Sequence, residues 1–411
     1  MFTQWLIGLR NLRRRPGRTL LTIGMIATST LLMVFVVGVR EGTYTDMIEL
    51  ATGTWSGQFQ VAADGYRETP SLFETIDDPD PLITRLEADP RVAGVTPRVS
   101  NAGLLSAGGD DDSRTVGALL TAVVPEREQR LFTVPNAIKE GTWLTPPADP
   151  EHKPIVLGRG VAKRLRVALG DEITYLGQAA DGSIAADIFI LGGIIESGAP
   201  ELDANVAFIR LADAQELFAL GRRVHTLHGK VHDLGRVQRF TDDFAIGAGL
   251  ELAPWMQVMP GLEQSIEADR VGGDIFLVII LFVVVLGIVN SMLMAVFERT
   301  RELGIMMALG TTPRAVVGTI VAESTGMAAV GVILGALGGV ALNAWLAGVG
   351  IPMGTEPVEF GGVLIERAYP HNTLAGSLTY PAIVLVAGAL AGLWPARRAA
   401  RLDPVHAIRE G

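Results

Sequence analysis

Residues 290–310 read NSMLMAVFERTRELGIMMALG. The stretch begins at the end of an uncharged segment of membrane-spanning length, passes through a short charged piece from Glu298 to Glu302, and leads into a second apolar segment. The core of a soluble protein does not require apolar, charged and apolar segments in this order. We expect a spanning helix that emerges on one side of the membrane, an amphipathic helix on that surface, and a helix that returns. The amphipathic helix would carry its charges on one face and Ile305, Met306 and Leu309 on the other. The surface helix would be well placed for another protein to push on.

The composition of the whole chain also predicts membrane segments. Of its 411 residues 49% are hydrophobic, and the mean hydropathy is +0.35, whereas a soluble chain of this length is usually hydrophilic on average. A helix needs roughly 20 apolar residues to cross a hydrocarbon core of ~30 Å. We therefore predict four transmembrane helices, at residues 20–39, 273–297, 315–349 and 378–396.

An arginine-rich start raises the alternative of a cleaved signal peptide. The apolar run at 20–39 is longer than a typical signal core, and no small-x-small cleavage site follows it, so we interpret it as a retained anchor. Within residues 1–19, Phe2, Trp5 and Leu9 recur at helical spacing beside arginines. This pattern predicts an amphipathic helix in the inner membrane interface; a disordered basic leader is the alternative.

The distribution of arginine predicts the orientation in the membrane. Residues 1–19 contain five arginines and no acid, the 298–314 segment contains three arginines, and the 397–411 tail contains four. The 350–377 loop has Arg367 as its single Lys or Arg. Because short cytoplasmic loops collect Lys and Arg, we expect both termini and the 298–314 segment in the cytoplasm, and the 350–377 loop outside it.

The long segment 40–272 then forms an extracytoplasmic domain inserted between the first two spans. Residues 41–272 contain 35 acidic and 20 basic residues, a net charge of −15. This excess argues against nucleic acid as a partner, because phosphate binding needs clustered Lys and Arg. The chain has no Cys, so packing must hold the domain together, and about 230 residues can bury a sufficient core.

Hydrophobic patterns predict an α+β fold for this domain, with a hairpin turn at Asp181-Gly182. Helical continuations at 40–50 and 256–271 predict two stalk helices, and we expect two similar subdomains, one inserted in the other. The expected strands lie at 58–62, 92–106, 114–124, 154–157, 172–176, 186–195, 205–209 and 225–231, and the expected helices at 81–88, 159–167, 213–220 and 234–244.

No catalytic, nucleotide-binding or metal-binding motif is recognisable. The chain lacks G-x4-G-K-[ST], H-E-x-x-H and G-x-S-x-G. His225, His228 and His232 could suggest a metal site, but in the predicted strand they do not share one face, and no known ligand pattern accompanies them. We interpret them as part of a surface strand. If the protein performs work, the energy must come from another subunit.

Two features of the spans have alternative interpretations. Glycines spaced four apart let helices approach closely, either within this chain or at a dimer seam; these are Gly331, Gly335, Gly339, Gly388 and Gly392. Glu323 lies near the inner end of the third span. Such an ionisable group either marks an ion route or lies at the level of the lipid headgroups.

Three blocks of the sequence resemble FtsX-like ABC transporter permeases. Residues 290–314 closely resemble the family block N-x-L-x5-E-R-x-R-E-I-G-I-x2-A-L-G-A. The tail PARRAARLDPVHAIR (395–409) resembles the family ending P-A-x2-A-x4-P-x2-A-L-R, and the head LRNLRRRPGRT (9–19) also fits. The outer domain is more distantly similar to those of lipoprotein-releasing (Lol) permeases and the macrolide exporter MacB, at residues 155–158, 168–171 and 189–192.

The resemblance implies a membrane protein of four transmembrane helices with a MacB- or Lol-like outer domain. It implies a non-catalytic permease that pairs with an identical or homologous permease and with two copies of a cytoplasmic P-loop ATPase. ATP and magnesium would be bound by the ATPase and not by this chain. The helix at 298–310 would be the ATPase-coupling helix, with Glu298, Arg299, Arg301, Glu302, Gly304, Met307, Ala308, Leu309 and Gly310.

The function implied by the resemblance is ATP-driven movement of material on the outer side of a bacterial inner membrane. Lipoprotein, or another lipid-anchored molecule drawn from the membrane lipid, is the preferred substrate. The alternatives are MacB-like efflux of a peptide or small molecule through a periplasmic adaptor, and FtsX-like regulation of a cell-wall hydrolase. The short hairpin at 176–187 lacks Pro, unlike the longer hook of Lol permeases that recruit a carrier protein, which argues against carrier recruitment here.

Overall fold

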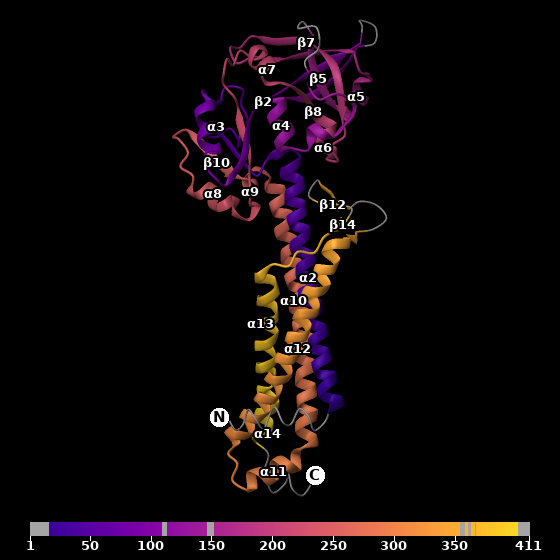
Figure 1. Cartoon of the computed structure of the whole chain (residues 1–411), viewed down its shortest axis with the longest axis vertical. Helices are drawn as coiled ribbons and strands as arrows, with labels where there is room; N and C mark the ends of the chain where they lie inside the picture. Colours follow the sequence, from indigo (N-terminus) through magenta and orange to yellow (C-terminus); the bar gives the residue numbers. More distant parts are fainter. Residues whose placement is uncertain are drawn as a thin grey trace. The chain divides into compact units, whose positions relative to one another are not determined.

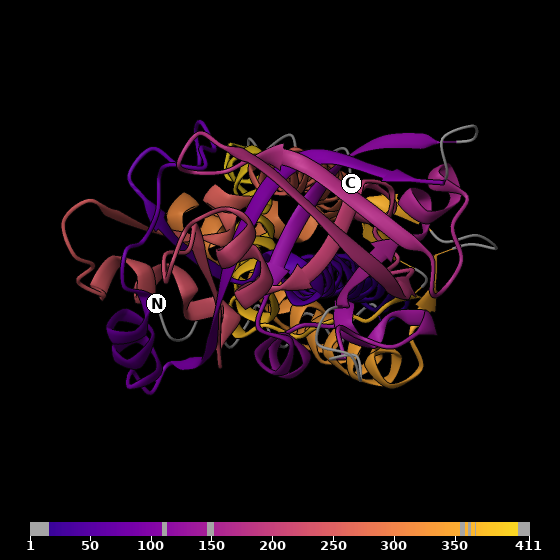
Figure 2. The same ribbon diagram turned by 90° about the horizontal axis from the view of Figure 1, so that it is seen from above.

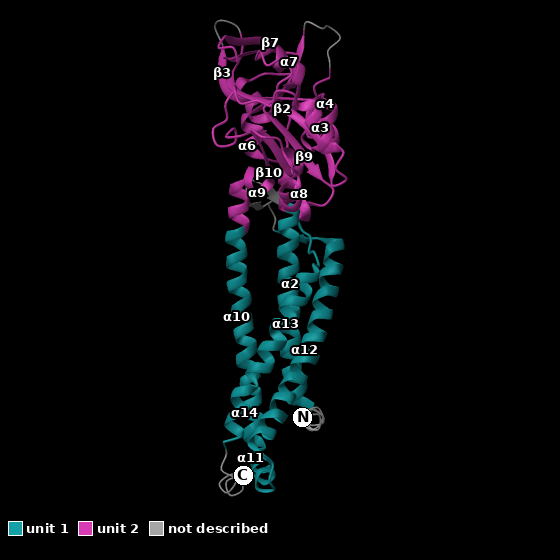
Figure 3. Cartoon of the chain, turned by 90° about the vertical axis from the view of Figure 1, so that its left-hand side faces the viewer, with its two compact units in different colours: residues 1–46, 267–356, 366–411 teal, residues 47–266, 357–365 magenta. Residues whose placement is uncertain are grey.

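The computed structural model describes residues 16–108, 113–145, 152–353, 358–360, 363–365 and 367–401. These residues form two compact units, a helical unit within 1–46, 267–356 and 366–411 and an α+β domain within 47–266 and 357–365 (Figure 3). The interfacial helix predicted within residues 1–19 and most of the 397–411 tail lie outside the described residues.

The helical unit is built from long apolar helices. Four helical stretches in the described residues are long and apolar enough to cross a membrane, namely 16–56, 260–298, 313–349 and 374–399. Each contains one of the spans predicted from sequence. The helices are α2 (Pro16–Ala51), α10 (Pro260–Glu298), α11 (Thr300–Ala308), α12 (Pro313–Val349), α13 (Leu374–Ala391) and α14 (Leu393–Ala399) (Figure 1). Between α12 and α13 lie two short strand pairs, β11 (Ile351–Pro352) with β14 (Arg367–Ala368) and β12 (Val358–Phe360) with β13 (Val363–Ile365).

Capping residues and prolines explain where these helices begin. Thr312 is the N-cap of α12, where its hydroxyl accepts a hydrogen bond from the backbone N–H of Ala315, and Pro313 follows at a position that tolerates proline. The predicted helix at 256–271 is interrupted: a short helix α9 (Trp255–Val258) ends at Met259, and α10 begins only at Pro260. Met259 leaves the helical region because a following proline disfavours that conformation.

The four long helices share one apolar core. Each helix contributes buried side chains, and the close van der Waals packing of these groups favours association of the helices. The buried members are Ile26, Met33 and Val37 from α2, Leu277, Val284, Ile288 and Met292 from α10, Met327, Ala328 and Val332 from α12, and Val384 and Ala391 from α13.

All five predicted packing glycines lie against a neighbouring helix of the same chain. Gly331, Gly335 and Gly339 of α12 face α2, and a Cβ at Gly331 would come within 2.8 Å of the Ile26 side chain. Gly388 and Gly392, at the end of α13, face α12. The small residues therefore let three helices of one chain approach closely; a role in a dimer seam stays a prediction.

A single ten-stranded sheet organises the α+β domain, and Figure 2 looks down on its long strands. The spatial order is β10-β1-β9-β2-β3-β8-β5-β7-β4, and β6 pairs with both β2 and β7. The strands are β1 (Phe59–Ala63), β2 (Val92–Ala107), β3 (Arg114–Val123), β4 (Ile138–Gly141), β5 (Lys153–Gly158), β6 (Glu172–Gln178), β7 (Ile184–Ile195), β8 (Val206–Arg210), β9 (Thr226–Val231) and β10 (Leu250–Pro254).

Six of these strands close into a ring. β2 pairs with β3, β3 runs parallel to β8, and β8 pairs with β5. β5 runs parallel to β7, and β6 joins β7 back to β2 through Leu104 opposite Leu176. The ring forms because β2 is long: residues 92–98 pair with β9, while residues 104–106 pair with β6 along the same edge. The predicted hairpin joins β6 to β7, and Gly182 in its turn has φ +85°.

Short helices surround the sheet. An apolar core within the domain contains Val123, Val134, Trp143, Leu144, Val156, Ile195, Val206 and Phe208. The helices are η1 (Thr52–Ser56, a π-helical turn), α3 (Pro79–Glu87), α4 (Pro125–Leu131), η2 (Val134–Asn136), α5 (Arg159–Leu165), α6 (Pro200–Asn205), α7 (Leu211–Leu217), η3 (Leu234–Arg236) and α8 (Val237–Asp243).

β2 pairs with strands of both halves of the domain and places them in one sheet, and a division into two similar subdomains stays a prediction. One sequence prediction about this domain is wrong. The strand carrying the histidines is not a surface strand, because β9 lies between β1 and β2 with His225 and His228 buried. His232 lies beyond its end and is exposed. No group of three or more His, Asp or Glu among the described residues is arranged to hold a metal ion.

Candidate functional site

Helix α11 lies between α10 and α12, where the sequence predicts the surface helix. α10 ends at Glu298, Arg299 leaves the regular helical conformation (φ −117°, ψ 13°), and α11 begins at Thr300. The Thr300 hydroxyl donates to the carbonyl oxygen of Phe297 at 2.9 Å. This hydrogen bond satisfies one of the carbonyls that the end of α10 leaves without an intrahelical partner.

A glycine ends the helix at a fixed place. Gly310 has φ +96°, the left-handed conformation that residues other than glycine rarely adopt. The N–H of Gly310 donates to the Met307 carbonyl, and the N–H of Thr311 donates to the Met306 carbonyl, both at 3.0 Å. These two bonds make a Schellman motif, so the chain turns sharply from α11 into α12.

The buried face of α11 differs from the prediction. Ile305, Met306 and Leu309 are predicted to form the apolar side away from the charges. In the structure Gly304 is the buried residue of this helix. Leu303 and Met307 pack on a cluster of Val296, Val316, Ile320, Ala396 and Ala399. Gly304 thus lies on the same packed side of the helix as Leu303 and Met307.

The outward face of α11 mixes charge with exposed apolar groups. Arg301, Ile305 and Leu309 are four residues apart, which places them on one side of a helix. Ile305 is 43% exposed and Leu309 is 83% exposed. Arg301, Glu302 and Ala308 are exposed as well. The outward face of α11 therefore places exposed apolar surface next to charged side chains.

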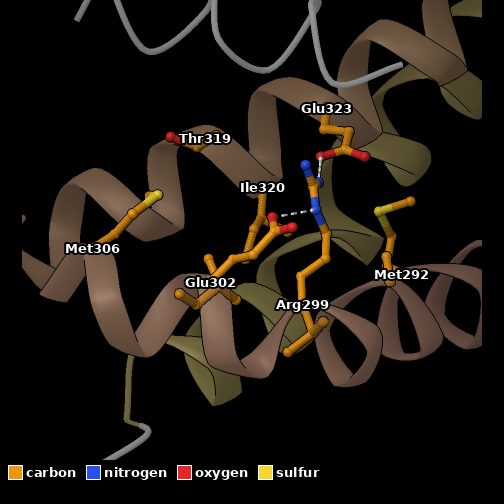
Figure 4. Close-up of a pocket in the computed structure, with 10 residues that line it drawn as sticks. Met292, Arg299, Glu302, Met306, Thr319, Ile320 and Glu323 are labelled. Carbon is orange, nitrogen blue, oxygen red and sulfur yellow. Dashed lines mark hydrogen bonds and ion pairs between the residues drawn. The ribbon is translucent and has the colours of Figure 1, made fainter. Parts of the chain in front are cut away.

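A cavity of about 190 Å³ lies behind this helix (Figure 4). Arg299 points into it between two acids: its Nε lies 3.4 Å from Oε2 of Glu302, and its Nη1 lies 3.4 Å from Oε2 of Glu323. The Glu323 side chain is only 8% exposed. An arginine from the turn therefore compensates the buried carboxylate of α12, which the sequence interpretation of Glu323 did not foresee.

Further contacts fix the ends of the neighbouring helices. The guanidinium of Arg18 on α2 donates to Glu298 at 2.8 Å, and the two side chains are only about a quarter exposed. Thr22 on α2 and Ser291 on α10 share a hydrogen bond of 2.6 Å between their hydroxyls. The guanidinium carbon of Arg398 lies 5.6 Å from the centre of the Phe297 ring. α11 is thus attached to a base that α2, α10, α12 and α14 build together.

The nine predicted coupling residues thus fall into different places. Glu298 and Arg299 form ion pairs at the base, Gly304 and Met307 face inward, and Gly310 ends the helix. Arg301, Ala308 and Leu309 face solvent, and Glu302 is exposed at the edge of the cavity, where it pairs with Arg299. Arg18, Leu303 and Glu323 support this helix as well, a role not predicted for them from the sequence. A sequence signal for the pairs Arg18–Glu298 and Arg299–Glu323 did exist. In each pair, residues of opposite charge lie at helix ends that are expected on the same side of the membrane.

Two family descriptions match the sequence. One is "FtsX-like permease C-terminal", over residues 275–404, and the other is "MacB-like periplasmic core domain", over residues 19–245. The second match alone covers more than half of the chain. The first match contains α11 and the residues around it.

Individual proteins are similar over different lengths. The lipoprotein-releasing system transmembrane protein LolC of Xylella fastidiosa is 25% identical over 335 residues, 78% of each chain. The pyoverdine export ATP-binding/permease protein PvdT of Pseudomonas fluorescens is 40% identical over 124 residues, 30% of this chain and 16% of that protein. The crystal structure of the periplasmic region of MacB from Actinobacillus actinomycetemcomitans aligns with 52% of this chain and 94% of its own, at 15% identity and a TM-score of 0.36.

Proposed function

This chain belongs to the family of FtsX-like permeases with a MacB-like periplasmic core domain, and on that premise we propose that α11 receives the force of a separate ATPase. The protein is a permease subunit of an ABC transporter, a bacterial membrane protein with a periplasmic domain. We propose further that both termini are cytoplasmic, that two permeases and two ATPase subunits assemble, and that the second permease is identical or homologous.

The observation that carries the proposal is the outward face of α11. Leu309 and Ile305 expose apolar surface next to Arg301 and Glu302 on a helix whose other face is packed. Apolar anchors within a polar rim are the usual anatomy of a protein interface. A soluble ATPase would bury these anchors. ATP and magnesium would then be bound by the ATPase, and this chain would need no site for them.

The route from α11 into the membrane runs through packed side chains. Arg299 links the turn to Glu323 on α12, and Leu303 and Met307 contact the cluster formed by α10, α12 and α14. α10 has 39 residues and α12 has 37, so each helix is about 55 to 60 Å long at 1.5 Å per residue. A displacement of α11 would therefore move long helices that start at its two ends.

Lipid-anchored protein is the proposed substrate. The support is the similarity to a lipoprotein-releasing transmembrane protein over 78% of this chain. A substrate whose acyl chains lie in the membrane needs no aqueous channel through this subunit, and the helical unit has an apolar core shared by all four long helices. ATP hydrolysis would then drive movement of a substrate that is already outside the cytoplasm.

The test of this proposal compares two exposed leucines. Leu309→Asp places a charge on the outward face of α11, whereas Leu374→Asp changes a residue of similar exposure at the start of α13 (83% and 82%). The permease is reconstituted in vesicles with its ATPase and an acylated lipoprotein. We expect Leu309→Asp to weaken ATPase binding at least tenfold and to abolish ATP-dependent lipoprotein release, while Leu374→Asp retains both. Equal behaviour of the two variants would remove α11 from the mechanism.

Export of a small molecule is the second candidate. The observation that favours it is the 40% identity to a pyoverdine export protein over 124 residues. Analysis of what co-purifies with the intact complex separates the candidates. Acylated protein supports lipoprotein release, and a periplasmic adaptor supports efflux. A peptidoglycan hydrolase would instead indicate regulation of the cell wall.

A further inference from the structure

The C-terminal end of α2 is held by hydrogen bonds from several other elements of the α+β domain. After Ala51 the helix widens into the π-helical turn Thr52–Ser56. Within this turn the Thr52 carbonyl accepts from Gly57 N–H at 3.0 Å, and the Gly53 carbonyl accepts from Thr133 N–H at 3.0 Å. Carbonyls at a helix end lack intrahelical donors and carry partial negative charge, so such donors stabilise the end.

Two buried side chains supply the remaining donors. Nη1 of Arg98, on β2, donates to the Trp55 carbonyl at 2.7 Å. Nδ1 of His228, on β9, lies 2.7 Å from the Ser56 carbonyl, and because a carbonyl oxygen can only accept, this nitrogen carries the hydrogen. Two strands of the sheet, β2 and β9, therefore bind consecutive carbonyls of the turn that ends α2.

Arg98 is buried deeply at this joint. It is 1% exposed, and its guanidinium carbon lies 3.8 Å from the centre of the Trp55 ring and 4.6 Å from the centre of the Phe132 ring. Glu128, on α4, accepts from it through both carboxylate oxygens, Nε–Oε1 at 2.8 Å and Nη2–Oε2 at 2.9 Å. The planar guanidinium thus contacts two aromatic rings, a carboxylate and a backbone carbonyl.

Stability alone does not require a charged pair at this position. Replacing a buried ion pair with apolar groups of similar volume is often neutral or stabilising, because the desolvation of two charges offsets much of their attraction. An apolar group could fill the space between Trp55 and Phe132. It could not donate to the Trp55 carbonyl, and it could not fix the orientation of the turn as a forked, planar donor does.

We propose that Arg98, oriented by Glu128, is a positioning residue that locks the end of α2 to the sheet so that movement of α2 reaches the α+β domain without slippage. This inference rests on the proposed function, in which the transporter acts by moving its helices. Arg98 touches neither substrate nor nucleotide in this role. It keeps the turn Thr52–Ser56 and strand β2 moving as one body.

The first experiment measures the rigidity of the joint. The chain has no Cys, so Leu50→Cys on α2 and Lys163→Cys on α5, both exposed, accept spin labels without background. We expect a narrow distance distribution in the otherwise unchanged chain. Arg98→Met with Glu128→Gln, which leaves no buried charge unpaired, should at least double the width of the distribution. A width that stays unchanged would overturn the inference.

Two further variants control for loss of packing and loss of charge. Arg91→Met removes an arginine that also lies over an aromatic ring, 5.1 Å from the centre of Phe240, and that pairs with Asp89. Arg91 does not bind the turn Thr52–Ser56 through any described hydrogen bond, so this variant should leave the distribution narrow. Arg98→Lys keeps the positive charge but lacks the forked donor geometry of the guanidinium, so it should broaden the distance distribution. A narrow distribution in this variant would contradict the positioning role.

The second experiment measures coupling in reconstituted complexes with the ATPase and an acylated lipoprotein. The Arg98→Met, Glu128→Gln variant should retain ATP hydrolysis and lose at least tenfold in lipoprotein released per ATP. Release per ATP equal to that of the unchanged chain would overturn the inference. If the unchanged chain releases no lipoprotein, the proposed function fails instead, and the label distances still decide whether Arg98 holds the joint.

Discussion

At the scale of single residues, Gly310 determines how α11 ends. Its φ of +96° permits the two hydrogen bonds that turn the chain into α12. We expect Gly310→Ala to destabilise this turn by about 1 to 2 kcal/mol, because an L-residue pays roughly that amount in the left-handed region. Thermal unfolding and the affinity for the ATPase would report the effect.

Gly24→Ala is the matched control for that substitution. Gly24 lies inside α2 with open space around its Cα, and alanine is favoured over glycine in a helix. This variant should leave ATPase affinity unchanged and stability equal or higher. If the two alanine variants behaved alike, the conformation of Gly310 would not matter to the coupling helix.

The two buried histidines predict a pH dependence of stability. Burial lowers the pKa of His225, and burial together with nearby Arg98 lowers the pKa of His228 well below the ordinary value. Below about pH 6.5 the unfolded chain therefore binds protons that the folded chain does not. The free energy of unfolding should be largest above this pH. It should fall as the pH is lowered, by up to roughly 1.4 kcal/mol per pH unit for each histidine.

Denaturant unfolding of the purified chain at pH 7.5 and pH 5.5 measures this dependence. His228→Gln should reduce the loss of stability between the two values, because one proton-linked group is removed. His232→Gln, at an exposed position, should leave the loss unchanged. A loss that is the same in all three proteins would assign the pH dependence to other groups.

At the scale of elements, the glycine stripe of α12 supports a prediction about packing. Gly335 faces the backbone of Ala27 and the side chain of Thr30 on α2, so Gly335→Val forces the helices apart. Overpacking of this kind costs typically 1 to 3 kcal/mol. We expect a melting temperature lower by several degrees, measured in detergent, whereas Gly348→Val, where nothing lies near the Cα, should have a smaller effect.

The same pair of variants separates intrachain packing from a dimer seam. If Gly335 packs against α2 of its own chain, Gly335→Val lowers the stability of the monomer and dimer alike. If it served a seam between two chains, size-exclusion chromatography would show dissociation with little change in monomer stability. The second result would contradict the contacts of α12 with α2.

Element positions were predictable from sequence where the pattern was strong. The alternating segment at 92–106 became β2, and Asp181-Gly182 marked the turn between β6 and β7. Short elements with few apolar residues were missed, among them β4 (Ile138–Gly141) and α6 (Pro200–Asn205). The facing of α11 was predicted wrongly because Gly304, which sets its buried side, has no hydrophobic side chain to reveal it.

At the scale of the whole molecule, the absence of Cys allows the orientation to be mapped. We predict that Leu309→Cys reacts with a membrane-impermeant maleimide only from the cytoplasmic side, and that Ser183→Cys, exposed in the β6–β7 turn, reacts only from the outer side. The reason is the excess of arginine at the termini and in the 298–314 segment. Labelling of Leu309→Cys in intact cells would show that the orientation is opposite to the predicted one and would exclude an ATPase at α11.

The sequence predicted the family and the order of parts better than the tertiary arrangement. Three blocks at 9–19, 290–314 and 395–409 were enough to indicate an FtsX-like permease, and both family matches agree with that interpretation. The joining of the outer domain into one sheet was not predictable. It depends on β2 pairing with β9 and β6 on one edge, and residues far apart in sequence leave no local pattern for such pairing.

The closed ring of β2, β3, β8, β5, β7 and β6 has a mechanical consequence. A strand with a free edge can be peeled away one bond at a time, or can capture a strand from a neighbouring molecule. Each strand of the ring has a hydrogen-bonded neighbour on both sides, so a pull on one strand loads two ladders of hydrogen bonds at once. These six strands therefore resist peeling, whereas β10 and β4 are the end strands of the sheet and are the places where peeling would begin.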